Sequence, residues 1–396
     1  MSKGKKFLLK IYDRTGNKVS LQTDISLSSF SWGLNGGPSE LTIRFPKQID
    51  DFGESSEINF FYRVKVYVFD QDSDPEGMLL YQGYINSYKQ VVKGTAEYVE
   101  AICLGYQTLL SRILLKSGSA TTVSYSSQEI ANIVKDAITK AASVVTTTQA
   151  LVDNTGVTVS FTFRNNTIKD VLDKCIDLSP EGFYWRSNPD NTITFAKVDY
   201  DATDFKLNFK KDFTELEVEK SMSDAANVLY FIGGGNPNLY KKYTRTSSVT
   251  EFGTLEATKS DERVTLTATA SSIAEAYLDK VDHPKVTVKL TISDNNLKRA
   301  SGINIEALRP GMVVAIRGIT DEEISYWDEA VWDVDFWDYD ILGALANPLV
   351  IKRLTYNIDS VTLELGDFIS TFARDYKSFE DRVSSLQYQN LPTTPS

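Results

Sequence analysis

The sequence contains few residues whose type and spacing could support catalysis. His283 is the single histidine, so a Ser-His-Asp or Cys-His site would have to include it. It stands beside Pro284, where a helix is expected to give way to a strand, and a surface or capping role is the simpler interpretation. The sequence has no Gly-x-Ser-x-Gly turn and no His or Cys cluster with zinc spacing. We therefore expect no catalytic residue, no cofactor and no metal site, and a protein that is not an enzyme.

Two other segments have the composition of ligand-binding loops. Residues 233–235 are three glycines after an expected strand, but they lack the GxGxxG frame and the Walker lysine, so a turn is the better interpretation. Residues 70–77 carry carboxylates at alternate positions. An EF-hand loop needs glycine at its sixth position, which here is Pro75. We expect a hairpin tip there, with weak calcium binding as the alternative.

The most unusual segment is residues 326–340, called here the Trp-Asp segment. Trp327, Trp332 and Trp337 recur every five residues, each is followed by aspartate, and they are three of the five tryptophans in the chain. A period of five matches neither one face of a helix nor one face of a strand. Aromatic residues are enriched at protein interfaces, so we favour a contact between subunits. A loop that packs on its own domain and a platform that stacks on sugar rings are the alternatives.

Composition limits the class of partner. The chain has 396 residues, more than a single hydrophobic core usually holds, so two or more domains are expected. Its net charge of -11 provides no basic surface for gripping phosphates, although DNA could still pass an acidic wall, and the charge could serve solubility alone. Cys103 and Cys175 lie in apolar segments and are expected to be buried thiols of a protein made in a reducing cytoplasm. We expect neither a signal peptide nor a membrane span.

The elements that must position these residues are mostly strands. In residues 7–115, apolar residues alternate with polar ones, for example Leu41, Ile43 and Phe45, which predicts a sandwich or a barrel. Residues 116–204 change period. Residues 126–129 (SSQE) form a capping-box pattern before an apolar stripe at helical spacing, a second helix is expected from near Thr167, and a hairpin follows, which together predict a small α+β domain.

Strand patterns return in residues 205–366 and give way to a helical pattern at the end of the chain. Residues 238–304 are interpreted as an insertion, with a helix opened by a second capping box at 272–275 (SIAE). In the final helix the apolar residues are spaced four and three apart, the spacing of a heptad seam. These seam residues are Phe372, Tyr376, Phe379, Val383 and Leu386. They predict either a threefold helical contact or a helix packed on its own subunit.

Four short motifs follow one another in a fixed order. Residues 81–85 (YQGYI) precede a strand that ends in residues 103–106 (CLGY). The second helix is followed by residues 182–185 (GFYW), and residues 308–311 (LRPG) precede a later strand. In this order, over most of residues 5–366, the sequence resembles phage tail-tip and baseplate-hub proteins, a family also found in phage-derived injection systems.

The resemblance implies a fold that is mainly β with α+β insertions. It implies two similar β-barrel tube-type domains, a small α+β domain and, in this chain, a C-terminal helix. The expected domains are a first barrel at 1–115, the α+β domain at 116–204, a second barrel split between 205–237 and 305–366, an insertion at 238–304, and a helix and tail at 367–396. The Trp-Asp segment then lies within the second barrel, which departs from the family pattern.

The resemblance also implies a structural function. Three subunits would present six barrels as a pseudo-hexameric ring that joins the hexameric tail tube to the trimeric tip and lines the channel for DNA or effector passage. The implied partners are two further copies of the chain, tail-tube and distal-tail or baseplate proteins, and a tip or spike protein. DNA would be present only in transit, and no stable membrane insertion is expected. The implied location is the virion tail, after synthesis in the host bacterial cytoplasm.

Two other functions stay open. A receptor- or glycan-binding tail protein would use the Trp-Asp segment. A peptidoglycan-degrading enzyme would need two carboxylates flanking a cleft, and no pair among the 53 acidic residues stands out in the sequence.

Overall fold

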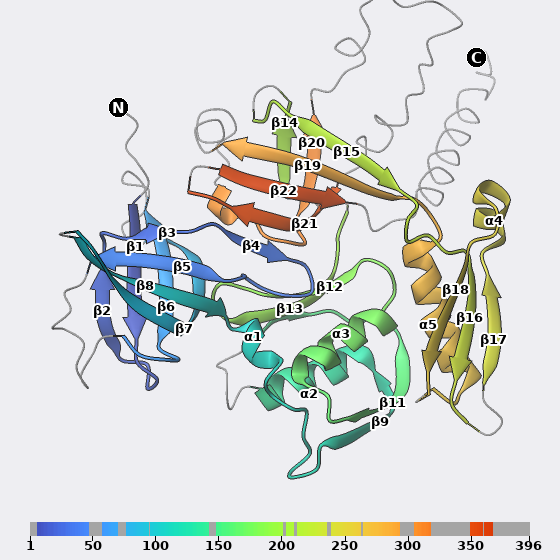
Figure 1. Ribbon diagram of the computed structural model, residues 1–396. Coiled ribbons are helices and arrows are strands. Elements are labelled where there is room, and N and C mark those ends of the chain that lie inside the picture. The colour runs from blue at the N-terminus through green and yellow to red at the C-terminus, as the bar shows by residue number, and fades with distance from the viewer. Residues whose placement is uncertain are drawn as a thin grey trace, which may run out of the picture. The chain divides into compact units, whose positions relative to one another are not determined.

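The computed structural model describes twelve stretches of the chain, which fall into two compact units (Figure 1). The described residues are 6–46, 58–69, 77–94, 96–141, 148–200, 203–209, 212–235, 239–262, 264–293, 305–317, 349–358 and 360–366. Unit 1 comprises Met1–Ile176, Phe183–Glu217 and Val288–Leu365. Unit 2 comprises Asp177–Gly182, Val218–Thr287 and Gly366–Ser396.

The first large sheet has seven strands in the order β2-β1-β6-β7-β8-β5-β3, and every neighbouring pair is antiparallel (Figure 1). Its strands are β1 Lys6–Tyr12, β2 Lys18–Gln22, β3 Ser26–Leu27, β5 Leu41–Pro46, β6 Arg63–Phe69, β7 Met78–Lys93 and β8 Ala96–Gly105, and the short helix α1 Gln107–Leu110 follows. The predicted alternation is confirmed, because Leu41, Ile43 and Phe45 are buried while Arg44 is exposed. Cys103 is a buried free thiol in this core, as predicted, and burial raises its pKa.

The second large sheet has the strand order β14-β20-β21-β22-β19-β15, and β4 also pairs with β21. Its strands are β14 Phe205–Asn208, β15 Leu216–Ser221, β19 Lys285–Ser293, β20 Val313–Arg317, β21 Leu349–Tyr356, β22 Ser360–Gly366 and β4 Phe30–Gly33, and a 3-10 turn, η2 Ile305–Ala307, precedes β20. The strand pattern predicted at the end of residues 205–366 is confirmed in β21 and β22. Alternation is regular in β19, where Val286, Val288, Leu290 and Ile292 are buried.

The two large sheets share one strand order. If β2 and β4 are left out, each large sheet has six strands, which can be numbered from first to sixth along the chain. Across the first sheet these strands lie in the order first, fourth, fifth, sixth, third, second. The six strands of the second sheet lie in the same sequence. One pairing differs in direction, since β1 and β6 are antiparallel whereas β14 and β20 are parallel. The fold is therefore mainly β and is built on a repeated sheet, which agrees with the two similar domains that the family resemblance implies.

The α+β segment of unit 1 lies between the two sheets in the sequence. It contains a three-stranded sheet in the order β10-β13-β12 and a two-stranded sheet of β11 and β9. Its elements are β9 Thr122–Glu129, α2 Ile130–Ala141, β10 Thr148–Val152, β11 Thr158–Arg164, α3 Ile168–Leu178, β12 Phe183–Ser187 and β13 Thr192–Lys197. Both predicted helices and the predicted hairpin are confirmed. The apolar stripe of α2 is buried, including Ile133, Val134 and Ile138.

The first predicted capping box is wrong. Residues 126–129 are the end of strand β9, and helix α2 begins only at Ile130. The carboxylate of Glu129 caps the helix instead, because its Oε2 accepts the backbone N–H of Ala131 at 2.7 Å. A reciprocal box does form at α3, where the backbone N–H of Thr167 donates to Asp170 at 2.9 Å and that of Asp170 donates to Thr167 Oγ1 at 3.2 Å.

Unit 2 is a three-stranded sheet, in the order β17-β16-β18, packed against a helix. Its elements are β16 Val228–Gly233, β17 Tyr240–Thr244, α4 Thr246–Phe252, β18 Glu256–Asp261 and α5 Thr267–Val281. Leu229 from the sheet packs with Ala274 and Leu278 from α5. The second predicted capping box is also wrong, since α5 begins at Thr267 and Ser272 lies inside it, donating its hydroxyl to the carbonyl of Ala268 at 3.2 Å.

Two strands belong to other sheets than the expected domain boundaries imply. The strand β16 falls in the expected second barrel but pairs with β17 and β18 of unit 2. The strand β19 falls in the expected insertion but belongs to the second large sheet. The Trp-Asp segment and the expected C-terminal helix at 367–396 lie outside the described residues. None of the described helices is both long and apolar enough to cross a bilayer.

Candidate functional site

The recognisable sequence motifs meet at one place in unit 1, called here the junction. It is formed by the loop 34–38 after β4, the strand β12, the turn 308–311 and the end of β8. The backbone N–H of Asn35 donates to the carbonyl of Trp185 at 2.8 Å, and the amide oxygen of Asn35 accepts the N–H of Trp185 at 3.1 Å. The N–H of Ser187 donates to the carbonyl of Gly36 at 2.8 Å. The junction thus hydrogen-bonds the α+β segment to the loop that links the two large sheets.

The strand β4 connects the two sheets directly. It lies between β3 and β5 in the sequence, but it pairs antiparallel with β21, with Trp32 opposite Leu354. The chain then returns to the first sheet through β5. Trp32 is 1% exposed, so its ring is part of the core. A short connection between two paired strands leaves the sheets little freedom to move independently, because the backbone hydrogen bonds of β4 would have to break first.

Two glycines allow close contact at the junction. A side chain on Gly105 would place its Cβ 2.4 Å from the carbonyl oxygen of Pro38. Gly311 has a φ of +89°, and its Cβ would lie 2.4 Å from the ring of Tyr184. Both contacts are shorter than any side chain allows, and the φ of Gly311 favours glycine for a second reason. The glycines of the CLGY and LRPG motifs are therefore explained by packing.

Two half-buried arginines lie beside these glycines. Arg186 donates from Nη1 to the carbonyl oxygen of Pro310 and from Nε to Asn188 at 2.9 Å. Arg309 lies over the indole of Trp32, 5.0 Å from the ring centroid, and donates to the carbonyl of Leu308 at 2.7 Å. Burial, together with the nearby charge of Arg186, lowers the pKa of Arg309 to about 10. Both groups therefore stay cationic at neutral pH, and backbone carbonyls and an aromatic face satisfy them.

The junction therefore has a mechanical role. Hydrogen bonds join its segments, and its two arginines lie half-buried among carbonyls and rings. Sequence reasoning identified three of the four segments as motifs and did not single out residues 35–38. It missed Trp32, and it missed Gln107. The side-chain amide nitrogen of Gln107 donates to the carbonyl of Pro38. The signal available for the loop was its Asn-Gly-Gly-Pro composition, which permits close backbone approach.

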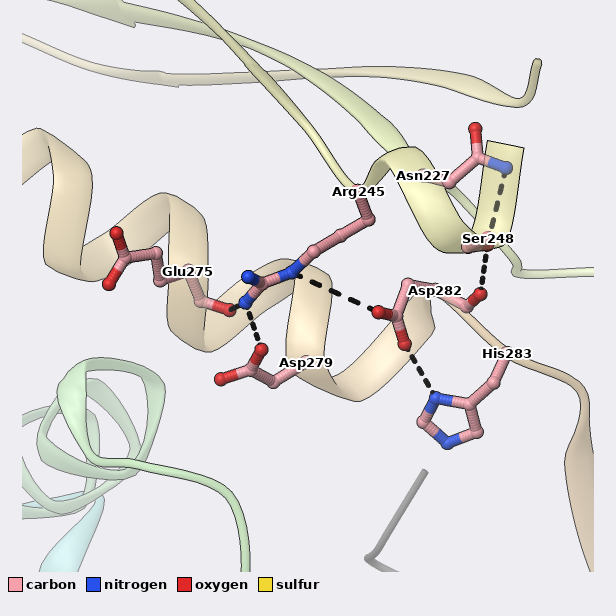
Figure 2. Close-up of polar contacts among 7 residues, drawn as sticks. All are labelled: Asn227, Arg245, Ser248, Glu275, Asp279, Asp282 and His283. Atoms are coloured by element: carbon pink, nitrogen blue, oxygen red, sulfur yellow. Dashed lines mark hydrogen bonds and ion pairs between the residues drawn. The ribbon is translucent and has the colours of Figure 1, made fainter. Parts of the chain in front are cut away.

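The single histidine lies in a polar cluster of unit 2 (Figure 2). Its Nδ1 is 2.7 Å from Oδ1 of Asp282. Ser248 lies near the same aspartate but donates its hydroxyl to the backbone carbonyl of Asp282. The hydroxyl proton is thus directed away from the imidazole, which is not the arrangement of a serine nucleophile and its base.

The rest of this cluster ties helices to strands. Arg245, just before α4, pairs with Asp279 of α5, and its Nε is 3.9 Å from Asp282 Oδ2 (Figure 2). Asn227 is fully buried and donates to the carbonyl of Gly253 at 2.7 Å and to Ser248 at 3.3 Å. Burial raises the pKa of Asp279 even though Arg245 opposes the shift. The cluster holds the C-terminal end of α5 against α4 and β16, which is a structural role.

Other candidate sites from the sequence have these outcomes. Residues 233–235 end strand β16, and the carbonyl of Glu262 would lie 1.9 Å from a Cβ on Gly234, so this glycine permits a close backbone contact. Within the described ranges, no group of three His, Cys, Asp or Glu side chains could hold a metal ion. Residues 70–76 lie outside those ranges. So do all the predicted interface residues, namely Trp327, Trp332, Trp337, Phe372, Tyr376, Phe379, Val383 and Leu386.

Comparison with solved structures finds the same fold in phage-type tail proteins. A tail protein from Neisseria meningitidis MC58 matches with a TM-score of 0.58 and 11% identity over 93% of this chain and 98% of that one. The 43 kDa tail protein of prophage MuSo2 from Shewanella oneidensis gives 0.59 and 10% over 93% and 99%. The prophage tail protein gp18 from Listeria monocytogenes EGD-e gives 0.53 and 13% over 95% and 99%. No protein-family model matches the chain. No curated protein matches its sequence.

Proposed function

We propose that the chain is a structural baseplate-hub or tail-tip protein that assembles as a trimeric ring. The observation that carries the proposal is the repeated strand order of the two large sheets. A subunit with two similar sheets can occupy two successive positions of a sixfold arrangement. Three subunits then form a ring that is threefold by chain and nearly sixfold by fold.

Such a ring would match two different symmetries. One side would contact a hexameric tail tube with six similar sheets, and the other would contact a trimeric tip or spike through the parts that occur once per chain. These single parts are the α+β segment and unit 2. The likeness to phage tail proteins over nearly the whole chain supports this assignment, since the fold is shared from end to end.

The junction supports the same function mechanically. A ring that transmits force between tube and tip needs the two sheets of each subunit in a constant relation. Pairing of β4 with β21 and the buried contacts of Arg309 and Trp32 supply that coupling within unit 1. The ring would line the channel through which DNA or an effector passes. Its role would be structural and not catalytic, with distal-tail or baseplate proteins as neighbours in the virion tail.

The first experiment is the mass of the purified chain in solution by light scattering. The expected mass corresponds to three copies of the 44.3 kDa chain. Electron microscopy of that species should then show a ring with six similar lobes and a central channel. A monomer at all accessible concentrations, and also in the presence of the matching tail-tube protein, would contradict the ring.

A second candidate function rests on the Trp-Asp segment. Its three regularly spaced tryptophans could stack on sugar rings, as expected of a receptor- or glycan-binding tail protein. Binding to a glycan array that is lost in Trp332→Ala, with an unchanged solution mass, would favour this candidate over the hub. Absence of glycan binding by a trimeric protein would exclude it.

A further inference from the structure

The outer face of three neighbouring strands, β2, β1 and β6, is basic in an acidic protein. These strands contain no aspartate or glutamate, although the whole chain has a net charge of -11. Register and alternation place every charged residue of the three strands on the face opposite the buried Leu9, Ile11 and Val66. The charged residues of this basic face are Lys6, Lys10, Lys18, Arg63 and Lys65.

Two of these lysines lie directly opposite each other. Lys10 of β1 pairs with Lys65 of β6 in the antiparallel register. Like charges in such a pair destabilise a sheet, so the fold carries an unfavourable interaction here. The ammonium groups lean away from each other, Lys10 to 4.5 Å from the ring centroid of Tyr67 and Lys65 to 5.5 Å from that of Tyr12. An acidic partner would convert this repulsion into attraction.

The same face has an apolar component. Leu21 lies opposite Lys10 on β2 and is 47% exposed. The rings of Tyr12 and Tyr67 are half-buried between the lysines. A partner that fits this surface should therefore present carboxylates together with aromatic or aliphatic side chains, because both kinds of contact are available side by side.

The chain itself contains a segment of that chemistry. The Trp-Asp segment has aspartate or glutamate at six positions, aromatic residues between them, and no lysine or arginine. Its acidic residues are Asp328, Glu329, Asp333, Asp335, Asp338 and Asp340. In the sequence it joins β20 to β21 of the second large sheet. In a ring of alternating first and second sheets, the second sheet of one copy neighbours the first sheet of the next.

We propose that the basic face of one copy binds the Trp-Asp segment of a second copy and thereby connects adjacent subunits of the ring. The inference rests on the proposed trimeric ring and names the contact that closes it. Nucleic acid is the less fitting occupant. A net negative chain repels DNA as a whole, and a phosphate-binding surface has no use for the exposed leucine.

The test compares two charge reversals of equal size. The double variant Lys10→Glu and Lys65→Glu should weaken trimerisation by about tenfold or more in dissociation constant, measured by analytical ultracentrifugation. The control is Lys241→Glu with Lys242→Glu in unit 2. It makes the same change in net charge, and Lys242 also lies over a tyrosine ring, that of Tyr230, at 5.4 Å. The control should keep the trimer.

A charge swap guards against misfolding of the first variant. Adding Asp333→Lys and Asp335→Lys to the Lys10→Glu, Lys65→Glu chain should restore the trimer, which a merely misfolded protein could not do. An unchanged trimer in Lys10→Glu, Lys65→Glu would overturn the inference while leaving the ring intact. A wild-type chain that never forms a trimer would instead contradict the ring.

A direct binding measurement separates the two proposals further. A fluorescently labelled peptide of residues 321–340 should bind the full chain and lose affinity for the Lys10→Glu, Lys65→Glu variant but not for the control. Equal peptide binding by variant and wild type would overturn the inference. Binding of a short DNA duplex through these lysines, without binding of the peptide, would also overturn the inference.

Discussion

The two large sheets have one strand order but present different surfaces. In the first sheet, Lys10 faces Lys65 across neighbouring strands, and Glu100 of β8 bridges Arg44 and Lys89 at 2.7 and 2.5 Å. In the second sheet, β19 and β22, which correspond to β5 and β8, meet through a neutral pair, Thr291 and Thr362, with hydroxyls 3.0 Å apart. The repeated order thus determines where the strands lie, while the outer side chains determine what each copy of the fold can contact.

The sheets also differ in their connections. The equivalent links are β3 to β5 in the first sheet and β15 to β19 in the second, and the first of these, residues 28–40, contains only the strand β4. The link from β15 to β19 in the second sheet contains unit 2, with its own small sheet and two helices. Because strand pairing is set by the register of the sheet and not by the length of the links, large insertions are tolerated at such positions. The repeat therefore keeps its topology while only one copy carries an additional unit.

The largest expected effect comes from uncoupling the two sheets. Trp32→Ala removes a buried indole under Arg309 and should lower the free energy of unfolding by about 3–5 kcal/mol. Chemical denaturation, followed by fluorescence and by circular dichroism, should show the loss and a separation of one transition into two.

The matched control is Val92→Ala, a strand residue of the first sheet that is 54% exposed. It should change stability by no more than about 0.5 kcal/mol. Equal effects of the two substitutions would contradict the coupling role assigned to Trp32.

A smaller effect is expected where the second sheet meets the α+β segment. Gly311→Ala forces a left-handed backbone on alanine and a clash with Tyr184, and should destabilise by about 2–3 kcal/mol. Gly16→Ala has a similar φ of +95° but nothing within 4 Å of its Cβ, so only about 1 kcal/mol is expected. The difference between the denaturant midpoints of the two variants measures the part of the destabilisation that is due to the clash with Tyr184. If they coincide, the close contact at the junction carries no energetic weight.

Removal of the like-charge pair should act in the opposite direction. Lys10→Gln with Lys65→Gln should stabilise the monomeric chain by about 0.2–1 kcal/mol at low salt. The gain in stability should vanish near 1 M salt, where the Debye length is only about 3 Å. Thermal unfolding at both salt concentrations gives the comparison with the neutral threonine pair of the second sheet. A loss of stability at low salt would show that the two lysines do not repel each other.

The smallest effect concerns acid. Hydrogen bonds from Lys89 and then Arg44 lower the pKa of Glu100 below its ordinary value of 4.5. The folded state therefore gains stability from this carboxylate at neutral pH, and the gain is lost as the pH falls below 4.5 through the folded-state pKa. Glu100→Gln should be slightly less stable than wild type at pH 7, and the difference should shrink as the pH falls through the folded-state pKa of Glu100. A difference that stays unchanged in acid would mean that the amide disturbs packing instead.

Local patterns in the sequence predicted most of the elements. Alternation identified β5, and the apolar stripe at helical spacing identified α2, because those periods follow from backbone geometry alone. The start of each helix was less predictable. The serines at 126–127 lie at the end of a strand and Ser272 lies inside a helix, yet both fit the sequence pattern of a helix cap. Only the tertiary pairing of the elements distinguishes these cases from a true cap. Thr155, distant in sequence, also donates to Glu129, at 2.8 Å.

The strand order and the junction were decided by the tertiary structure. Nothing local in Phe30–Gly33 indicates that β4 leaves the first sheet to pair with β21, more than 300 residues later in the chain. Likewise, the contacts of Arg186 and Arg309 depend on segments brought together by three different sheets. The sequence by itself determined periodicity, charge and the glycines that permit close approach. Which strands pair is a choice among many non-local alternatives of similar local energy, and only the packing of the whole unit distinguishes them.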